Sequence, residues 1–406
     1  MSKIFSVAAP RTHIIIFALI TALCLLGDSM LYVVLPVHYE EAGLASLWEV
    51  GIILATNRLA RLPLNPCIGW FYSRFSERTG IFIATVLAVA TTLSYSILPG
   101  LLFWIVARCV WGVAWTLLRL GSLFCILKLS TPENRGEYTG LYNGLYRLGS
   151  LFGMLLGGIL ADAIGFATTA VIFGGVSALS VIAVFFFIPR GEPSRHDASS
   201  AESVFTSLKL AAQDPKTLWT VAAGGFIAFS TQGVATSTLS HLIAEHTNGG
   251  VTLIATFIGA ASLSGFFQAL RWLWEPWLSP FIGRVSDTRY GRSSMLCVAF
   301  GLGIVMFALL ALPLPVPLWF VCLLGMLLTA TLLTTLIEAS ASDLASLSGG
   351  RVLLMAYALT TDVGAALGPL MAYSLNEIMG INAVYAVNAL LFMVFFIRWT
   401  AWRKAG

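Results

Sequence analysis

The sequence predicts an all-α integral membrane protein, built from twelve transmembrane helices in two six-helix halves. Its composition gives the first reason, because 58% of the 406 residues are hydrophobic, 10% are charged, and the mean hydropathy is +0.87. An ordinary soluble domain carries roughly 25% charged residues. The spacing of the apolar runs and the placement of the basic residues give two further reasons, because both follow the pattern of a chain that crosses a bilayer repeatedly.

Apolar runs of about 20 residues, the length that crosses the hydrocarbon core as a helix, alternate with turn signals along the chain. They predict spans at residues 13–36, 47–72, 80–98, 101–127, 140–161, 166–189, 217–242, 252–282, 294–312, 316–338, 352–374 and 380–400. The first run exceeds the roughly 7–15 apolar residues of a secretory signal. We therefore expect it to be a span and not a cleaved leader.

One long polar stretch divides the spans into two sets of six. We expect a first six-helix bundle at residues 1–189, a cytoplasmic linker at 190–216 and a second bundle at 217–406. Within the linker, residues 205–212 favour a short helix along the membrane surface.

The two halves also resemble each other. At one offset along the chain, Gly51 pairs with Gly265, Pro66 with Pro280 and Gly69 with Gly283. At an offset that is one position longer, Gly149 pairs with Gly364 and Gly153 with Gly368. Duplicated six-span halves are typical of secondary transporters.

Basic residues follow the topology of these spans. Apart from six arginines well inside the spans, the Lys and Arg residues fall at the N-terminus, in the loops after the even-numbered spans and at the C-terminal end, where Arg398 lies in the final residues of the last span. Basic loops stay on the cytoplasmic side of a membrane. We therefore expect a multi-pass protein of the plasma (inner) membrane with both termini in the cytoplasm.

The six arginines inside the spans are the first candidates for function. They are Arg58, Arg61, Arg108, Arg119, Arg147 and Arg271. A charged side chain in hydrocarbon is costly, so such residues face a partner or a water-filled cavity. A position near the inner end of a span, as for Arg119, also allows the guanidinium to reach the interface.

Two loops carry a motif similar to one of the major facilitator superfamily. The loop that begins at Gly69 and contains Arg74 resembles the G-x-x-x-D-R-x-G-R-R motif of that superfamily, with Ser73 in place of its acid. The matching loop in the second half begins at Gly283 and keeps the acid as Asp287.

The fifth span strengthens this resemblance, which extends over essentially the whole chain. Its glycines fit the pattern of proton-coupled antiporters in that superfamily, with Met154 where the pattern has proline; they are Gly140, Gly149, Gly153, Gly157 and Gly158. The fourth span contains Arg108 and Gly112 in an R-x-x-x-G element. The resemblance implies the twelve-helix transporter fold, export against proton entry, and a modulating role for Arg108. Small residues at this spacing also permit close helix packing by themselves.

Asp28 is the first candidate for the proton carrier. With a rise of about 1.5 Å per residue, Asp28 and Arg58 lie at similar depths below the outer ends of the first two spans, so they can pair directly. Arg61 and Arg108 are rival partners. A carboxylate whose partner changes between the inward-open and outward-open states can take up and release a proton. The alternative is a permanent ion pair that only fixes the helices.

Two other acids inside the spans are alternative carriers, Asp362 in the eleventh span and Glu275 in the eighth. Arg271 precedes Glu275 by one helical turn, the spacing of an ion pair on one helix face. Neutralisation by Arg271 is therefore the favoured interpretation of Glu275.

The distribution of buried charge suggests the cargo. In the first half five of the arginines face one acid deep in the spans, Asp28, whereas in the second half one arginine faces Glu275 and Asp362, with Glu338 at the end of its span. An anionic or zwitterionic amphiphile complements this distribution. The candidate binding residues are Arg58, Arg61, Trp111, Trp115, Tyr146, Arg147, Gln268, Arg271 and Tyr357. The aromatic members can hold a ring-bearing or apolar portion, although such stripes often serve only packing.

These observations predict a transporter and no enzyme. The favoured function is proton-coupled export of a small anionic or zwitterionic amphiphile, such as a metal-chelating metabolite or a drug. Import of an organic anion by symport and a non-transporting receptor or scaffold are the alternatives. The sequence contains no phosphate-binding loop, and the basic residues are explained by topology, so neither ATP hydrolysis nor nucleic-acid binding is indicated. We expect protons and a small molecule as partners within the lipid bilayer, a monomer, and neither a cofactor nor a bound metal.

Overall fold

The computed structural model describes residues 10–97, 100–131, 134–188, 214–253, 256–347 and 350–405. These residues form twelve long helical segments, which confirms the predicted all-α membrane class. The described residues fall into two compact units, each built on one half of the chain. Unit 1 lies within residues 1–49, 56–201 and 261–269, and unit 2 lies within 50–55, 202–260 and 270–406.

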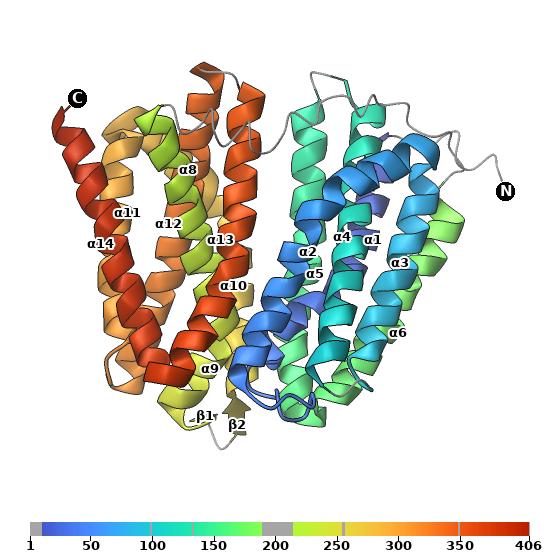
Figure 1. Ribbon diagram of the computed structural model, residues 1–406, viewed down its shortest axis with the longest axis horizontal. Coiled ribbons are helices and arrows are strands. Elements are labelled where there is room, and N and C mark those ends of the chain that lie inside the picture. Colours follow the sequence, from blue (N-terminus) through green and yellow to red (C-terminus); the bar gives the residue numbers. More distant parts are fainter. Residues whose placement is uncertain are drawn as a thin grey trace. The chain divides into compact units, whose positions relative to one another are not determined.

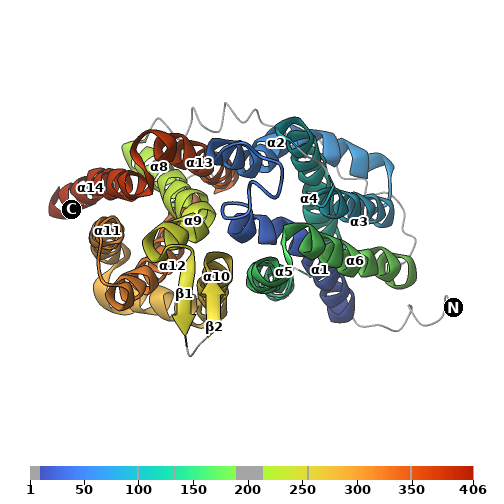
Figure 2. The ribbon, with the colours of Figure 1, turned by 90° about the horizontal axis from the view of Figure 1, so that it is seen from below.

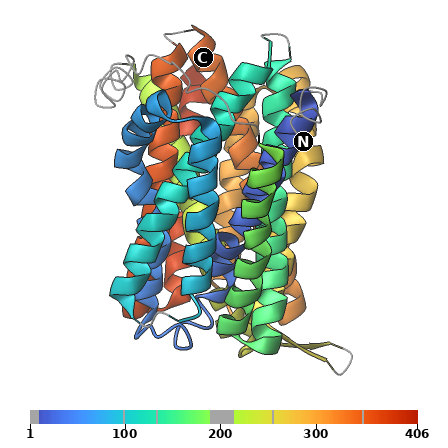
Figure 3. The ribbon, with the colours of Figure 1, turned by 90° about the vertical axis from the view of Figure 1, so that its right-hand side faces the viewer.

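The first half supplies six helices that run alternately up and down (Figure 1). They are α1 (Pro10–Val34), α2 (Leu47–Arg74), α3 (Glu77–Ser94), α4 (Leu101–Leu129), α5 (Arg135–Ile164) and α6 (Phe166–Phe187). Within this unit α3 packs between α4 and α6, as Figure 3 shows, and α1 packs against both α5 and α6.

The second half repeats this order with two additions, a π-helical segment in its first span and a β-hairpin before its second. Its elements are α8 (Pro215–Ile227), η1 (Ala228–Ala235), α9 (Thr236–Thr247), β1 (Gly250–Leu253), β2 (Thr256–Gly259), α10 (Ala260–Val285), η2 (Ser286–Tyr290), α11 (Arg292–Leu310), α12 (Val316–Leu347), α13 (Gly350–Met379) and α14 (Ile381–Ala405). Asp214 caps α8 by accepting hydrogen bonds from the backbone N–H groups of Lys216 and Thr217.

Nine of the helical segments in the described part of the chain are long and apolar enough to cross a membrane. The other three predicted spans are α2, α3 and α10. Two of these, α2 and α10, contain arginines and two internal prolines each, and α3 begins with Glu77 and Arg78. Their lower hydropathy comes from these polar residues, and in α2 and α10 the arginines include candidate functional residues.

The predicted eighth span, 252–282, is wrong at its start. Residues 250–253 pair antiparallel with residues 256–259, with Val251 opposite Ile258 and Thr252 opposite Phe257, and α10 begins only at Ala260. Figure 2 shows this hairpin beside the ends of α9 and α10. β-Branched and aromatic residues favour a pleated strand, and the apolar run alone did not distinguish a strand from a helix.

The expected linker and its surface helix at residues 205–212 lie almost entirely outside the described residues. The described chain resumes at Asp214, and α8 follows at Pro215.

Glycines bring α5 into backbone contact with α1. A Cβ atom built on Gly149 would lie 2.2 Å from the carbonyl oxygen of Ala22, and one on Gly153 would lie 2.7 Å from that of Leu26. One on Gly157 would lie 2.5 Å from Cβ of Met30. The fourth-residue spacing on both helices means that α1 and α5 run side by side over three turns with almost no side chain between them.

The second unit repeats this packing at the equivalent positions. In α13, a Cβ on Gly364 would lie 2.1 Å from the carbonyl oxygen of Gly225 in α8, and one on Gly368 would lie 2.4 Å from Cα of Gly233 in η1. The internal repeat in the sequence therefore corresponds to one helix pair that is built twice.

Two exchanged helical stretches show the same symmetry. Residues 261–269 of α10 belong to unit 1, where Gly265 approaches the carbonyl oxygen of Met154 in α5. Residues 50–55 of α2 belong to unit 2, where Gly51 approaches the carbonyl oxygen of Pro369 in α13. Gly51 corresponds to Gly265 in the repeat, and Met154 corresponds to Pro369 at nearly the same offset. The Gly265–Met154 and Gly51–Pro369 contacts are therefore equivalent under the repeat.

An ion pair near the loop side of each unit also obeys the repeat, with its charges reversed. Glu77 at the start of α3 binds Lys128 of α4 at 2.6 Å, and Arg292 at the start of α11 binds Asp343 of α12. Arg292 follows Glu77 at the same offset at which Asp343 follows Lys128. The scaffold is thus conserved between the repeats while the sign of the charge is not.

We expect Gly149→Ala to lower the thermal unfolding midpoint of the purified protein, because its new methyl group must push apart the backbones of α1 and α5. Overpacking of this kind costs about 1–3 kcal/mol. Gly140→Ala is the matched control in the same helix, since nothing lies within 4 Å of its Cβ position. Equal midpoints for the two variants, measured by intrinsic tryptophan fluorescence in detergent, would contradict the packing role.

Candidate functional site

The centre of unit 1 contains a buried carboxylate bound by two other helices. Asp28 of α1 accepts a hydrogen bond of 2.5 Å from Nη1 of Arg108 in α4 and one of 3.2 Å from Nδ2 of Asn57 in α2. Arg108 is completely buried and Asp28 is 9% exposed. The ion pair of Asp28 is therefore formed with Arg108, one of the rival partners, and not with the first candidate Arg58.

The packing of α1 explains this geometry. The glycines of α5 hold α1 closely, and Ser29 donates a hydrogen bond of 3.1 Å to Ser150 of α5 directly beside Asp28. The neighbouring residue on α1 is thereby directed away from α5 and toward α4. Burial strengthens the attraction between the two charges, because little solvent screens it. Removal of either partner would leave an uncompensated buried charge.

Aromatic side chains continue from this pair along α4 and α5. The ring centroids of Trp111 and Trp115 lie 6.5 Å apart, those of Trp115 and Tyr146 5.8 Å, and those of Tyr146 and Tyr142 5.2 Å. Arg119 donates to the Tyr146 hydroxyl at 2.9 Å and lies over its ring. Trp111 is buried in the core, whereas Trp115 and Tyr146 are half-buried.

The six arginines of the predicted spans differ in burial. Arg108 and Arg271 are buried, Arg58 and Arg61 are half-buried, and Arg119 and Arg147 are exposed on the protein surface. Only the first two are enclosed by protein. The other four reach surfaces that a cargo, water or lipid headgroups can contact.

The superfamily-like motifs serve packing and loop structure to different degrees. Gly149, Gly153, Gly157 and Gly158 are tightly packed, Gly158 against the carbonyl oxygen of Ala261 at 2.3 Å from its Cβ position. Gly140, Gly69 and Gly283 have open space at their Cβ positions.

The two motif loops are held differently. Asp287 binds Arg292 at 2.9 Å, and this hydrogen bond holds the pKa of Asp287 below its usual value. In the first loop, the replacement Ser73 donates instead to the carbonyl oxygen of Trp70 at 2.7 Å, and the guanidinium of Arg74 lies 4.7 Å from the centroid of the Trp70 ring.

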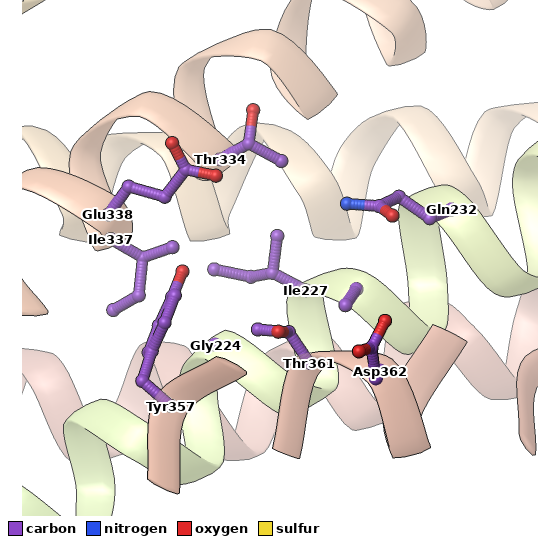
Figure 4. A pocket seen from close by; sticks show the side chains of 10 residues that line it. Gly224, Ile227, Gln232, Thr334, Ile337, Glu338, Tyr357, Thr361 and Asp362 are labelled. Atoms are coloured by element: carbon purple, nitrogen blue, oxygen red, sulfur yellow. The ribbon is translucent and has the colours of Figure 1, made fainter. Parts of the chain in front are cut away.

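Unit 2 contains a small polar pocket with two acids. Glu338 of α12 and Asp362 of α13 line it together with the Tyr357 hydroxyl and the Gln232 amide. Figure 4 shows Glu338 and Tyr357 on one side of the pocket and Gln232 and Asp362 on the other. Its volume is about 70 Å³. Drug-sized ligands occupy pockets of about 300–1,000 Å³, so this space suits a small charged group.

The π-helical segment η1 shapes this pocket. Ala228 and Gln232 belong to it, and Thr236 donates to the carbonyl oxygen of Thr231 five residues earlier, which is the π-type spacing. π-Bulges often occur at functional sites because they displace side chains from the regular helical position. Here the bulge contributes Gln232 to a pocket otherwise lined by α8, α12 and α13.

Asp362 has a counterpart of opposite charge in the first half. At the offset of the repeat it corresponds to Arg147, and Tyr357 corresponds to Tyr142. Arg108, in contrast, corresponds to the buried apolar Leu323. The repeats therefore place opposite charges at one equivalent position, and the equivalent of Arg108 in the second half is apolar.

The remaining predicted residues lie along α10. Gln268 is buried in unit 1, while Arg271 and Glu275 belong to unit 2. The guanidinium of Arg271 lies 5.9 Å from the centroid of the Trp272 ring. The division of α10 between the units falls between Gln268 and Arg271, which the helical spacing alone did not indicate.

Three residues of these sites were missed from the sequence. Asn57 and Gln232 are amide residues within predicted spans, and each lies beside other polar residues, which is the signal that could have identified them. Glu338 is the last residue of the predicted span 316–338. It is exposed, α12 continues past it to Leu347, and Glu338 lines the pocket with Asp362.

We expect strong energetic coupling between Asp28 and Arg108. Asp28→Asn and Arg108→Gln should each cost about 3–5 kcal/mol of unfolding free energy, and the double variant should lose about 1–3 kcal/mol less than the sum. Unfolding in mixed detergent measures these values. The partly exposed pair Glu77 and Lys128 is the control, with smaller coupling expected; strictly additive losses at Asp28 and Arg108 would refute the ion pair.

Comparisons with known proteins agree with this architecture. Residues 17–277 match the family model of the Major Facilitator Superfamily. The Multidrug resistance protein MdtG of Proteus mirabilis is 26% identical over 403 residues, covering 93% of this chain and 92% of that protein. The Probable small intestine urate exporter of Homo sapiens is 28% identical over 176 residues, covering 42% of this chain and 35% of that protein.

The Synaptic vesicular amine transporter of Homo sapiens is 23% identical over 188 residues, covering 46% of this chain and 35% of that protein. The match thus spans about a third of the length of the urate exporter and of the amine transporter. A solved POT family transporter in complex with a thioalcohol-conjugated peptide has a TM-score of 0.76 at 12% identity, covering 97% of this chain and 96% of that chain. A bacterial homologue of the human lysosomal transporter Spinster has a TM-score of 0.72 at 14% identity, covering 97% and 96%. The family model covers more than half of the chain, and the twelve-helix fold agrees with it: this protein belongs to the Major Facilitator Superfamily.

Proposed function

We propose that this protein exports a small anionic or zwitterionic amphiphile across the inner membrane in exchange for protons. The observation that carries the proposal is the buried Asp28–Arg108 ion pair in a chain of this transporter family. The two termini lie in the cytoplasm in this proposal, because the basic residues gather in the even-numbered loops.

Asp28 has the properties of a proton carrier. Its carboxylate is bound by two donors from two different helices, so a shift of α1, α2 or α4 changes how well its charge is compensated. A carboxylate with its arginine in place stays ionised, and one that is separated from the arginine in an apolar setting binds a proton. Alternating access supplies such shifts, and proton uptake can thereby be coupled to them.

Each unit, considered by itself, carries charges that suit one kind of charged group on a cargo. The pocket of unit 2, with Glu338 and Asp362, suits an ammonium group. In unit 1 the exposed Arg147 occupies the position equivalent to Asp362 and suits a carboxylate. Among the relatives, one is named for urate and another for amines, so both charge types occur in this set.

The direction of transport rests on two supports. The fifth span carries the glycine row that resembles proton-coupled antiporters, and the relative that matches nearly the full chain is named for multidrug resistance. Symport of an organic anion is the alternative. In inverted vesicles with an imposed pH gradient, cargo addition should release protons from the lumen for antiport and remove external protons for symport.

We expect Asp28→Asn to abolish accumulation driven by a pH gradient while leaving exchange of labelled for unlabelled cargo at least partly intact. A neutral amide cannot release a proton at physiological pH, but it can still accept a hydrogen bond from Arg108. The measurement is uptake of a zwitterionic quinolone into inverted vesicles. Glu137→Gln, at an exposed acid in the first turn of α5, is the control and should transport normally. Uphill transport by Asp28→Asn would transfer the carrier role to Asp362 or Glu275.

We expect charge-selective effects from Asp362→Asn and Arg147→Gln. Loss of one charge-assisted hydrogen bond weakens binding by roughly tenfold. Asp362→Asn should weaken binding of the zwitterionic quinolone but not of an analogue without the amine, and Arg147→Gln should spare the methyl ester of the carboxylate. Equilibrium binding to protein in nanodiscs measures both effects. Equal losses for all compounds would indicate a folding role.

A further inference from the structure

Unit 1 contains a second cluster of ionisable residues at the end opposite to the start of α1. His38 lies in the loop between α1 and α2, and its side chain is 14% exposed. Its Nδ1 lies 2.8 Å from Oε1 of Glu41, and its Nε2 lies 3.2 Å from Oδ1 of Asp162 in the last turn of α5. We call His38, Glu41, Asp162 and Ser262 the His38 cluster.

Both ring nitrogens of His38 therefore face carboxylate oxygens. An ionised carboxylate only accepts hydrogen bonds, so both nitrogens must donate, which requires the imidazolium form. A neutral imidazole would direct a lone pair at one of the two acids. Burial lowers the pKa of His38, but the hydrogen bonds with Asp162 and Glu41 outweigh it and leave the pKa above its ordinary value of 6.5.

Asp162 links this histidine to the start of α10. Its Oδ2 accepts hydrogen bonds from the backbone N–H of Ser262 at 2.8 Å and from the Ser262 hydroxyl at 2.6 Å. Gly259, the N-cap residue of α10, provides no side-chain cap. Asp162 thus satisfies a backbone donor that the first turn of a helix cannot pair by itself, and its charge is favourable at that helix end.

Asp162 lies near the C-terminus of α5, so its negative charge needs compensation from neighbouring groups. A carboxylate near a helix C-terminus is unfavourable for its own helix dipole. The compensation comes from the positive His38 on one side and the N-terminus of α10 on the other. If His38 loses its proton, its positive charge is lost and its remaining N–H can pair with only one of Asp162 and Glu41, so the orientation of Asp162 toward Ser262 is less well supported.

The loop that carries His38 is fixed from several sides. The indole N–H of the buried Trp104 in α4 donates to the carbonyl oxygen of Ala42 at 3.1 Å. Glu41 accepts a hydrogen bond from the backbone N–H of Phe166 at the start of α6 at 3.2 Å. The charged groups that act on the His38 ring are Glu41 from its own loop and Asp162 from α5. The first turns of α10 also pack against α5 through Gly158 and Gly265, and Asp162 adds the ionisable part of this attachment.

We propose that protonated His38 fastens the first turn of α10 to the last turn of α5, and that loss of this proton releases α10. His38 is then a positioning residue that acts through Asp162. The first turns of α10 belong to unit 1, whereas its remainder from residue 270 belongs to unit 2, so this attachment bears on movement of α10 during transport. The proposed proton-driven cycle gives the attachment its role, but the attachment itself needs neither cargo nor a gradient.

The pH dependence follows from the direction of the shift. Because attachment raises the affinity of His38 for its proton, the stabilisation is fully present below the ordinary pKa of 6.5 and is lost as pH rises through the raised pKa. If the His38 cluster lies on the outer side, as the distribution of basic residues predicts, an acidic exterior favours attachment. That is the direction expected when proton entry drives the carrier away from its outward-open state.

The test is the distance between α5 and the first part of α10 as a function of pH. Spin labels at the exposed Ile159 and Phe266, both in unit 1, report it by pulsed electron resonance in nanodiscs after the native cysteines are replaced. We expect a short distance at pH 6 and a growing longer-distance population toward pH 9. Release of one proton changes the ratio of the two populations by at most about tenfold per pH unit.

Three variants make the result decisive. His38→Gln should remove the pH response, whereas His13→Gln, at the other end of α1, should keep it. Ser262→Ala retains the histidine but weakens the attachment of α10 to α5. It should therefore increase the longer-distance population at every pH, and that population should still grow as the pH rises. A pH response retained in His38→Gln, or a wild-type distance that stays constant from pH 5.5 to 9, would overturn the proposal. Failure of proton-driven transport would leave this measurement unaffected, so the two proposals can fail separately.

Discussion

Helices in a bilayer gain nothing from the hydrophobic effect when they associate, so their contact depends on close packing. In this protein the α1–α5 contact meets that requirement with glycines that let the two backbones touch over three turns. The same contact determines the direction in which α1 presents its polar residues. Ser29 binds α5, and Asp28 is directed to Arg108 and Asn57. The buried ion pair is therefore a consequence of the helix packing as much as of the two charges.

The repeats preserve packing and vary charge. Gly149 and Gly153 have structural equivalents in Gly364 and Gly368, and the contacts of Gly51 and Gly265 are related by the same repeat. Charged residues behave differently, since Glu77 and Lys128 exchange sign with Arg292 and Asp343. Backbone contacts tolerate almost no change, because an added methyl group meets a carbonyl oxygen. Charges at the helix surface can be exchanged at little cost, so each unit can acquire its own chemistry.

This division separates three tasks in the proposed mechanism. The enclosed Asp28–Arg108 pair suits proton exchange, because its energy depends on the relative positions of three helices. The pocket with Glu338 and Asp362 suits recognition of a small cation, because its acids are accessible and its volume is limited. The His38 cluster suits control of movement, because Asp162 joins a titratable ring to the start of another helix. In each case the proposed function follows from the burial of the charged group and from its hydrogen-bond partners.

The sequence alone determined the helical class of the chain, its twelve helical segments and the arginines inside them, because hydropathy and helical spacing are local properties. It also identified the glycine row, since only small residues at that spacing allow such packing. Tertiary structure decided which residues meet. Depth along the helices allowed Arg58, Arg61 or Arg108 as the partner of Asp28, and the choice of Arg108 depends on which helix faces α1. The hairpin at 250–259 could not be separated from a helix by its apolar run, and the His38 cluster joins residues from distant parts of the chain. Such contacts depend on how each helix is rotated about its axis and on which helices lie beside it. The residue order within one segment does not specify either.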